Sequence, residues 1–173
     1  QFGINATVVG WYNADNNSGY YGENGIYGDD LRPRELVAEA IDTAESAGID
    51  FSIFDNDGDG YVDGLFVVHS GPGEEESFNP NDIWSHRWEL GEFSRVYDGV
   101  IINDYTIEPE LQNAQHAQIG VYCHEYGHLL GLPDLYDTDG SSAGIGNWGL
   151  MAGGSWGGDG ESPEKPSHMC PWS

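Results

Sequence analysis

Basic side chains are scarce in this chain of 173 residues. Five basic residues, among which Lys165 is the single lysine, stand against thirty acidic residues, and the formal net charge is −25. Nucleic acids and anionic membrane surfaces bind proteins through clustered Lys and Arg. The composition therefore argues against both as partners and is typical of a soluble, cation-binding protein.

Long apolar runs are also missing, and cysteine is rare. A membrane span needs about 20 consecutive apolar residues, so we expect no membrane span. Cys123 and Cys170 are the only cysteines. In an exported protein they could form one disulfide, and in a reducing compartment they would stay thiols. No export signal is recognisable, so an exported protein would carry its targeting segment outside these residues or have lost it.

One motif carries most of the chemistry, a His-Glu-Tyr-Gly-His run at residues 124–128. Residues three and four apart share one face of a helix, so His124 and His128 can bind the same metal ion. Glu125 stands beside them and can reach a water molecule at that ion. A bare motif of this length recurs by chance and would be weak evidence alone.

The residues after the motif strengthen the interpretation. Gly131 can end the helix in a left-handed turn, and the chain can then fold back to present Asp134 as a third ligand. Two imidazoles and one carboxylate leave a fourth tetrahedral position open, as in catalytic zinc sites. We expect one zinc ion held by His124, His128 and Asp134, with Glu125 as the general base of peptide hydrolysis.

This extended pattern resembles that of the metzincins, in which H-E-x-x-H-x-x-G-x-x-H precedes a Met-turn. Asp134 stands where the last histidine would be, and Met151 is the candidate for the Met-turn. We expect its side chain to form a hydrophobic floor under the ligands without touching the zinc. Ala152 and Gly153 follow, so the tyrosine found there in some metzincins is missing and no transition-state donor is evident.

Further runs, taken together with the metal motif, resemble the immune inhibitor A-type secreted metallopeptidases over nearly the whole chain. They lie at residues 61–63, 67–71, 83–86, 134–137, 146–148 and 154–156. The resemblance implies a zinc-dependent endopeptidase that is exported, often accompanied by calcium, and active on extracellular proteins or peptides. It also places the segment with Trp84 and His86 near the edge strand that binds substrate, and a hydrogen-bonded structural role is the equal alternative for His86.

An acidic loop is the second candidate site. Its carboxylates follow the spacing of the opening of an EF-hand loop, and the Tyr61 carbonyl is an expected further ligand. The carboxylates belong to Asp55, Asp57, Asp59 and Asp63. The bidentate glutamate of an EF-hand is absent, and a solvated turn is the alternative. Because such close carboxylates repel each other without a cation, we favour one or more structural calcium ions.

The organisation predicts an α+β fold of the metzincin type, with a twisted mixed sheet, two main helices and a loop-rich lower lobe that carries the Met-turn. Helical spacing predicts helices at 33–47 and 113–131, and β-type runs predict strands at 4–11, 65–69, 83–90 and 100–108. The 65–69 strand should be buried and parallel.

These elements would form one catalytic domain over 1–173. Residues 1–130 would make an upper lobe and 131–173 a lower lobe. A metzincin usually ends with a helix after its Met-turn, and no helical period follows Met151 here. We therefore expect a truncated lower lobe.

Two alternatives compete with a monomeric, secreted zinc endopeptidase. A thermolysin-like enzyme would take its third ligand from a later helix, but Glu161 and Glu164 lie in a Gly/Pro-rich tail. A catalytically weak calcium-binding surface or adhesion module could retain the peptidase fold. It would be favoured by loss of Glu125 or of a zinc ligand, and all of these residues are present.

Overall fold

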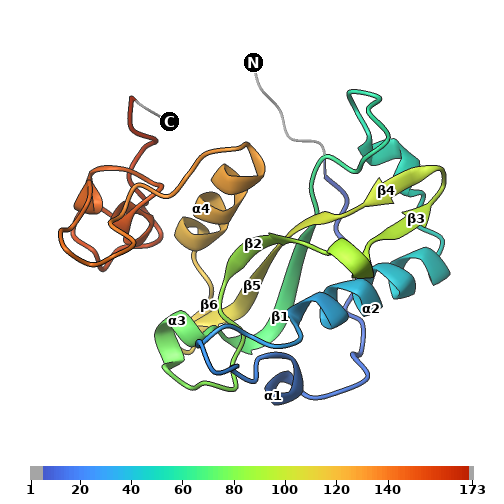
Figure 1. The fold of residues 1–173 in the computed structure, drawn as a ribbon, viewed down its shortest axis with the longest axis horizontal. Coiled ribbons are helices and arrows are strands. Elements are labelled where there is room, and N and C mark those ends of the chain that lie inside the picture. Colours follow the sequence, from blue (N-terminus) through green and yellow to red (C-terminus); the bar gives the residue numbers. More distant parts are fainter. Residues whose placement is uncertain (1–5, 172–173) are drawn as a thin grey trace.

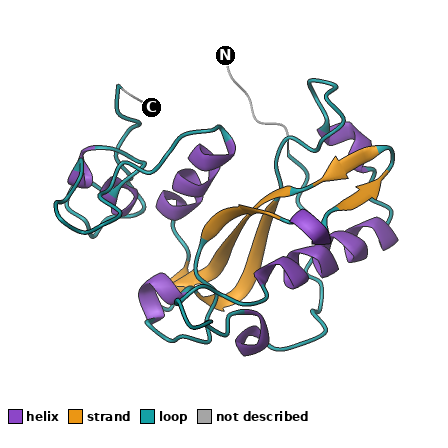
Figure 2. Cartoon of the chain, in the orientation of Figure 1, coloured by secondary structure: helices purple, strands orange, loops and turns teal. Residues whose placement is uncertain are grey.

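The computed structural model describes residues 6–171, which form a mixed sheet flanked by helices and a loop-rich segment that follows it (Figures 1 and 2). The helices are α1 (Ser18–Tyr21), α2 (Pro33–Ser46), α3 (Glu74–Ser77) and α4 (Ile119–Leu129). The strands are β1 (Phe66–Pro72), β2 (His86–Glu89), β3 (Arg95–Tyr97), β4 (Val100–Ile102), β5 (Asp104–Gln112) and β6 (Gln115–His116). Short 3₁₀ turns lie at η1 (Phe51–Phe54), η2 (Gly91–Phe93), η3 (Gly146–Trp148) and η4 (Gly153–Trp156).

β5 is the central strand of the larger sheet. β1 pairs with it in parallel, and β2 pairs antiparallel along its other edge. β6 continues the sheet at the end of β5, while β3 and β4 form a separate two-stranded ribbon. The expected mixed sheet in an α+β fold is therefore present, and β2 is one of its edges.

The hydrophobic core lies between α2 and one face of the sheet. Val37, Ile41 and Ala44 recur at helical spacing on α2 and are buried. They belong to the same core cluster as Tyr105 and Ile107 of β5. Because alternate residues of a strand point to opposite faces, the residues between these two must face the other side.

That other side is covered by α4 (Figure 1). The Tyr122 hydroxyl donates to the Pro109 carbonyl of β5 at 2.8 Å. One turn further along α4, the Tyr126 ring stacks on Phe66 of β1, with ring centroids 5.6 Å apart. The sheet thus separates the hydrophobic core under α2 from the helix that carries the metal motif.

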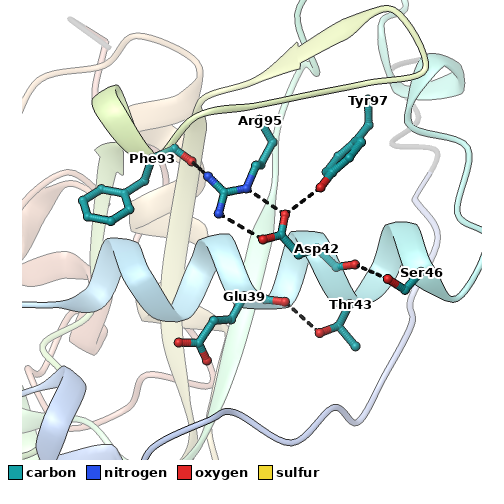
Figure 3. A network of polar contacts seen from close by, with 7 residues as sticks. All are labelled: Glu39, Asp42, Thr43, Ser46, Phe93, Arg95 and Tyr97. Carbon is teal, nitrogen blue, oxygen red and sulfur yellow. Dashed lines mark hydrogen bonds and ion pairs between the residues drawn. The ribbon is translucent and has the colours of Figure 1, made fainter.

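An ion pair fixes α2 to the β3–β4 ribbon (Figure 3). Arg95 binds both carboxylate oxygens of Asp42, at 2.7 and 3.0 Å, and also donates to the Phe93 carbonyl. The Tyr97 hydroxyl donates to the same carboxylate at 2.8 Å. These hydrogen bonds, led by that from Arg95, lower the pKa of Asp42 below its usual range.

Helix α2 and the loop-rich nature of residues 131–171 agree with the sequence predictions, but several other elements differ. Residues 6–11 are not a strand, and residues 4–5 of that prediction lie outside the described residues. The strand predicted at 100–108 is two strands, β4 and β5, separated at Asn103. β1 is parallel as predicted but not buried, since Phe66 and Val68 are 41% and 38% exposed. It is an edge strand whose apolar run is only partly covered.

The metal-motif helix begins six residues later than predicted, at Ile119. Asn113 and Ala114 have left-handed backbone angles (φ 51° and 55°) and form the turn between β5 and β6, so the helix cannot start there. None of the helices in residues 6–171 is both long and apolar enough to cross a bilayer. Cys123 and Cys170 are not joined by a disulfide.

Glu108 is an unusual core residue. It is fully buried on the α4 side of β5, and neither of its carboxylate oxygens has a hydrogen-bond partner among the described residues. Burial raises the pKa of Glu108 well above its usual range; the Thr106 hydroxyl opposes this, and the negative charges of Glu125 and Glu75 add to it. Glu108 therefore holds its proton in the folded protein at a pH where the unfolded chain has released it.

We expect Glu108→Gln to stabilise the protein increasingly as the pH rises. Below the unfolded pKa of about 4.3 both states are protonated and the two proteins should melt alike. Above it, Glu108 of the wild type must take up a proton when the protein folds, and this uptake becomes less favourable as the pH rises. The stability of the wild type therefore falls relative to that of the variant, whose side chain does not titrate. By pH 8 the variant should melt at a clearly higher temperature than the wild type, because the cost of protonating Glu108 grows with pH.

Thermal melts of both proteins between pH 4 and 8 measure this difference. Glu92→Gln, at an exposed position, is the control and should show no such trend. A Glu108→Gln variant that is less stable than wild type at pH 8 would contradict the assignment of Glu108 as a buried neutral acid.

Candidate metal centre

Helix α4 places His124 and His128 on one face, as the spacing requires. Their rings lie 4.8 Å apart between centroids and nearly perpendicular, and their Nε2 atoms are 3.2 Å apart. Both side chains are largely buried. The two ring nitrogens therefore converge on a single point beside the helix.

Asp134 completes a triangle with them. The helix ends before Gly131, which has a left-handed φ of 86°, and the chain turns back as predicted. Asp134 Oδ1 then lies 3.2 Å from Nε2 of His124 and 3.2 Å from Nε2 of His128. Ligand atoms about 2.0–2.1 Å from a tetrahedral zinc ion lie about 3.3 Å from one another. The triangle has the size that three zinc ligands require.

Hydrogen bonds on the far side of each ring set the direction of its lone pair. Nδ1 of His124 lies 2.9 Å from the Leu150 carbonyl, and Nδ1 of His128 lies 2.8 Å from the Leu132 carbonyl. A carbonyl can only accept, so each Nδ1 carries the proton and each neutral ring turns the lone pair of Nε2 inward. Metal-binding histidines are commonly oriented in this way.

The three inward-facing atoms need a positive charge between them. Asp134 Oδ1 is buried and accepts no regular hydrogen bond within the described residues. The neighbouring carboxylate of Asp134 raises the pKa of His128, so the site favours positive charge. Burial alone would raise the pKa of Asp134, but the two histidines hold it well below its usual range. The residues present fit a divalent cation.

Glu125 lies on the buried side of α4, only 6% exposed. Burial raises the pKa of its carboxyl group above the usual range, while His124 and His128 oppose the rise. The backbone of Arg87, on the edge strand β2, also opposes the rise in pKa. Glu125 thus stands between the histidines and that strand.

The loop-rich segment closes the centre from below. Met151 is fully buried, and its sulfur lies so close to Gly127 of α4 that a side chain there would collide with it. The Met151 carbonyl accepts the backbone N–H of Leu135 at 2.7 Å, next to Asp134. The segment that holds His124 through Leu150 therefore also holds the chain that presents Asp134.

The structure does not place the side chains of Trp84 and His86, the two predicted substrate contacts, beside the triangle of ligand atoms. The His86 ring donates from Nδ1 to the Trp84 carbonyl at 2.7 Å, and its Nε2 lies 3.1 Å from the Tyr105 hydroxyl. Tyr105 and Ile107, which pairs with His86, belong to the α2 core, on the opposite face of the sheet from α4. Trp84 is half exposed, and its backbone N–H is bound to Asp30.

The acidic loop brings together three of its four carboxylates. Asp55, Asp57 and Asp63 each offer an oxygen atom, and these atoms all lie within 4.8 Å of one another. Asp59 is not in this group: its Oδ1 accepts the Tyr61 backbone N–H at 2.8 Å. The loop continues through Gly64 into β1, so its conformation is linked to the strand that packs against α4.

Tyr136 was assigned no role from the sequence, yet it lies at the centre. Its ring is nearly parallel to that of His124, with the ring centroids 6.5 Å apart, and its hydroxyl helps to lower the pKa of Asp134. The only sequence signal is its position two residues after Asp134. The next acidic residue, Asp137, lies in a turn. Its carboxylate accepts hydrogen bonds from the backbone N–H of Asp139 and from the Ser141 hydroxyl.

Comparisons with known proteins point to one family. The family model described as Immune inhibitor A peptidase M6, catalytic domain, matches residues 1–173. The chain is 35% identical to Immune inhibitor A of Bacillus thuringiensis subsp. alesti, over 90% of the chain and 27% of that protein. It is also 35% identical to Pre-pro-metalloprotease PrtV of Vibrio cholerae serotype O1 (strain M66-2), over 91% of the chain and 20% of that protein. The chain thus spans about a quarter or a fifth of these curated relatives. The matches confirm the resemblance inferred from the motifs.

We expect Gly127→Ala to destabilise the protein. The added Cβ would lie 2.4 Å from the sulfur of Met151 and 3.1 Å from its Cε, so this fully buried side chain would have to shift within the core. Overpacking costs about 1–3 kcal/mol, whereas replacing glycine by alanine inside a helix gains only about 1 kcal/mol. The melting temperature should fall.

Gly158→Ala is the matched control, because a Cβ at Gly158 meets no atom within 4 Å. Its melting temperature should stay close to that of the wild type. A Gly127→Ala protein as stable as Gly158→Ala would show that the contact with Met151 is loose.

Proposed function

This chain belongs to the immune inhibitor A peptidase M6 family of metallopeptidases, and from that premise we propose that it is the catalytic domain of a secreted, zinc-dependent endopeptidase. The observation that carries the proposal is the triangle formed by His124, His128 and Asp134, whose three ligand atoms lie 3.2 Å apart. Two imidazole nitrogens favour zinc over calcium or magnesium, which prefer oxygen ligands.

Nε2 of His124, Nε2 of His128 and Oδ1 of Asp134 would hold the ion. Zinc bound there supplies Lewis acidity, which acidifies water and polarises a peptide carbonyl. The Leu150 and Leu132 carbonyls keep both histidines in the tautomer that can act as ligand. In this tautomer neither histidine carries a proton at Nε2, so we assign both of them a binding role and no role in proton transfer.

Glu125 would act as the general base. Its carboxylate accepts the proton of the attacking water as the new carbon–oxygen bond forms, and it delivers that proton to the leaving amine as the peptide bond breaks. Burial raises the pKa of Glu125, which brings its proton affinity closer to that of a base working near neutral pH.

An extended peptide would bind along β2. This strand is an edge of the sheet and lies next to α4, so its free backbone groups can pair with substrate. Recognition through the main chain would accept unfolded proteins and flexible peptides of varied sequence. The side chain of His86 is directed away from this site, so we restrict the proposal to the backbone of β2.

We also propose that the fold is of the metzincin type, with Met151 in its Met-turn. In support, Met151 is fully buried, and its sulfur packs against Gly127 of α4. Residues 1–130 and 131–173 would then be the upper and lower lobes of a single monomeric catalytic domain. The name of the Vibrio relative describes a precursor with pre and pro segments, which suits export of this protein and action on extracellular substrates.

Calcium would stabilise the domain without entering the chemistry. Asp55, Asp57 and Asp63 offer three hard oxygen ligands in one place, and Asp59 with the Tyr61 carbonyl would join them only after the loop rearranges. The ordered loop would anchor the start of β1, where Phe66 stacks on Tyr126 of the zinc helix.

We expect Glu125→Gln to retain zinc but to lose at least about 10²-fold in the rate of casein hydrolysis, because the ligands remain and the base is removed. Metal analysis and a fluorescent casein assay measure the two quantities on the same sample.

Asp134→Ala should bind zinc poorly, while Asp137→Ala should bind it normally. Near-normal turnover by Glu125→Gln would rule out its role as base, and a wild-type protein without zinc or hydrolysis would favour the adhesion-module alternative.

Millimolar calcium should raise the melting temperature of the wild type. A ligand bound only by the folded state adds about 2.7 kcal/mol of stability at a hundredfold excess over its Kd. The double variant Asp55→Ala/Asp57→Ala should lose most of this rise, whereas Asp139→Ala, in the other acidic turn, should keep it. Melts at constant zinc and varied calcium decide; an equal response in all three proteins would place the stabilising ion elsewhere.

A further inference from the structure

Asp134 faces a demanding geometric requirement. One of its oxygens must lie 3.2 Å from two different imidazole nitrogens. Unlike the histidines, which are held from behind by carbonyl groups, Asp134 follows the end of α4 on an irregular stretch of chain. A carboxylate in such a place can rotate about two side-chain bonds, and each rotation would break the triangle. The orientation of the Asp134 carboxylate therefore depends on a further interaction.

The Tyr136 side chain is in the place to provide this interaction. Its hydroxyl interacts with the carboxylate of Asp134, two residues earlier in the chain. Its ring lies almost parallel to that of His124, at an interplanar angle of 16°. The same side chain therefore contacts the carboxylate through its hydroxyl and one imidazole through its ring.

The backbone of Tyr136 is itself held firmly. The preceding residue, Leu135, donates to the Met151 carbonyl at 2.7 Å and accepts from the Ile145 N–H at 3.1 Å. Gly144 lies so close to the Tyr136 Cα that no side chain would fit there, and it has a left-handed φ of 54°. Tyr136 is thus anchored to the segment that closes the centre from below.

The chemistry of the phenol suits a permanent donor. A phenolic hydroxyl loses its proton only well above neutral pH. At neutral pH the hydroxyl is protonated and can donate to the carboxylate without adding a second negative charge. Donors of this kind behind a metal ligand fix its orientation, and their loss typically costs about 10–100-fold in metal affinity.

We propose that Tyr136 is a positioning residue of the metal centre: its hydroxyl holds Asp134, and its ring supports His124, in the arrangement that binds the ion. The inference rests on the proposed zinc site. It assigns to Tyr136 the part for Asp134 that the Leu150 and Leu132 carbonyls have for the histidines.

The test compares Tyr136→Phe with the wild type. The variant keeps the ring over His124 and removes only the hydroxyl. Its zinc Kd, measured by competition with a chromophoric chelator, should rise about 10–100-fold. The metal-free protein should melt at the same temperature as the metal-free wild type, since the fold keeps its packing. Tyr136→Leu, which also loses the ring, should bind zinc more weakly still.

Tyr126→Phe is the matched control, since it removes a tyrosine hydroxyl from the metal helix itself. Its ring stacks on Phe66, away from the triad, so its zinc Kd should match that of the wild type. The cobalt-substituted proteins give an independent measure: the visible absorption of the cobalt ion should change in Tyr136→Phe, because Asp134 is no longer held, and not in Tyr126→Phe.

A zinc Kd of Tyr136→Phe within twofold of the wild type overturns the proposal. So does a fall in metal-free melting temperature that accounts for the loss of affinity, since Tyr136 would then be structural. Failure of the zinc site itself gives a different result: the wild type would bind no zinc, or Asp134→Ala would bind it as the wild type does.

Discussion

The metal centre depends on main-chain carbonyl groups that lie behind its histidines. Leu150 accepts the Nδ1 proton of His124, and Leu132 accepts that of His128. These two bonds select one tautomer and turn both lone pairs toward Asp134. Without them the rings could rotate or protonate at the other nitrogen, and three convergent ligand atoms would not exist. Everything that places Leu150 and Leu132 therefore also places the two candidate ligand nitrogens.

The placement of Leu150 is a matter of close packing between α4 and the loop-rich segment. Gly127 leaves room for the Met151 sulfur, and Gly120 lies so near the Ser155 carbonyl that no side chain would fit there. The Met151 carbonyl binds Leu135, which joins the chain beyond Asp134 to the same segment. A stretch without regular helices can thus be precise, because its contacts with one helix are short and mutually dependent.

Charge gives the structure a second constraint. With five basic residues against thirty acidic ones, few carboxylates can find a guanidinium. Asp42 does so through Arg95, whereas Glu108 and Glu125 are buried without such a partner, and burial raises the pKa of each. Bound metal ions would supply positive charge that the chain itself lacks, at the triad and at the Asp55 loop. The excess of acidic residues and the proposed binding of metal ions are therefore linked by charge balance.

The sequence by itself determined the features that depend on near neighbours along the chain. They include the apolar face of α2, the shared face of His124 and His128, and the left-handed turn at Gly131. Helical spacing and backbone sterics act over a few residues, so a pattern suffices. Tertiary structure decided the rest. Residues 6–11 have a strand-like composition but do not form a strand, and the pairing of β2 with β5 turns His86 toward the α2 core. Tyr136 lies over His124 because Leu135 is bound to Met151, and Asp59 is drawn from the other carboxylates by Tyr61 N–H. Most of these outcomes depend on partners far away in sequence, and no local pattern encodes which partner a side chain will meet.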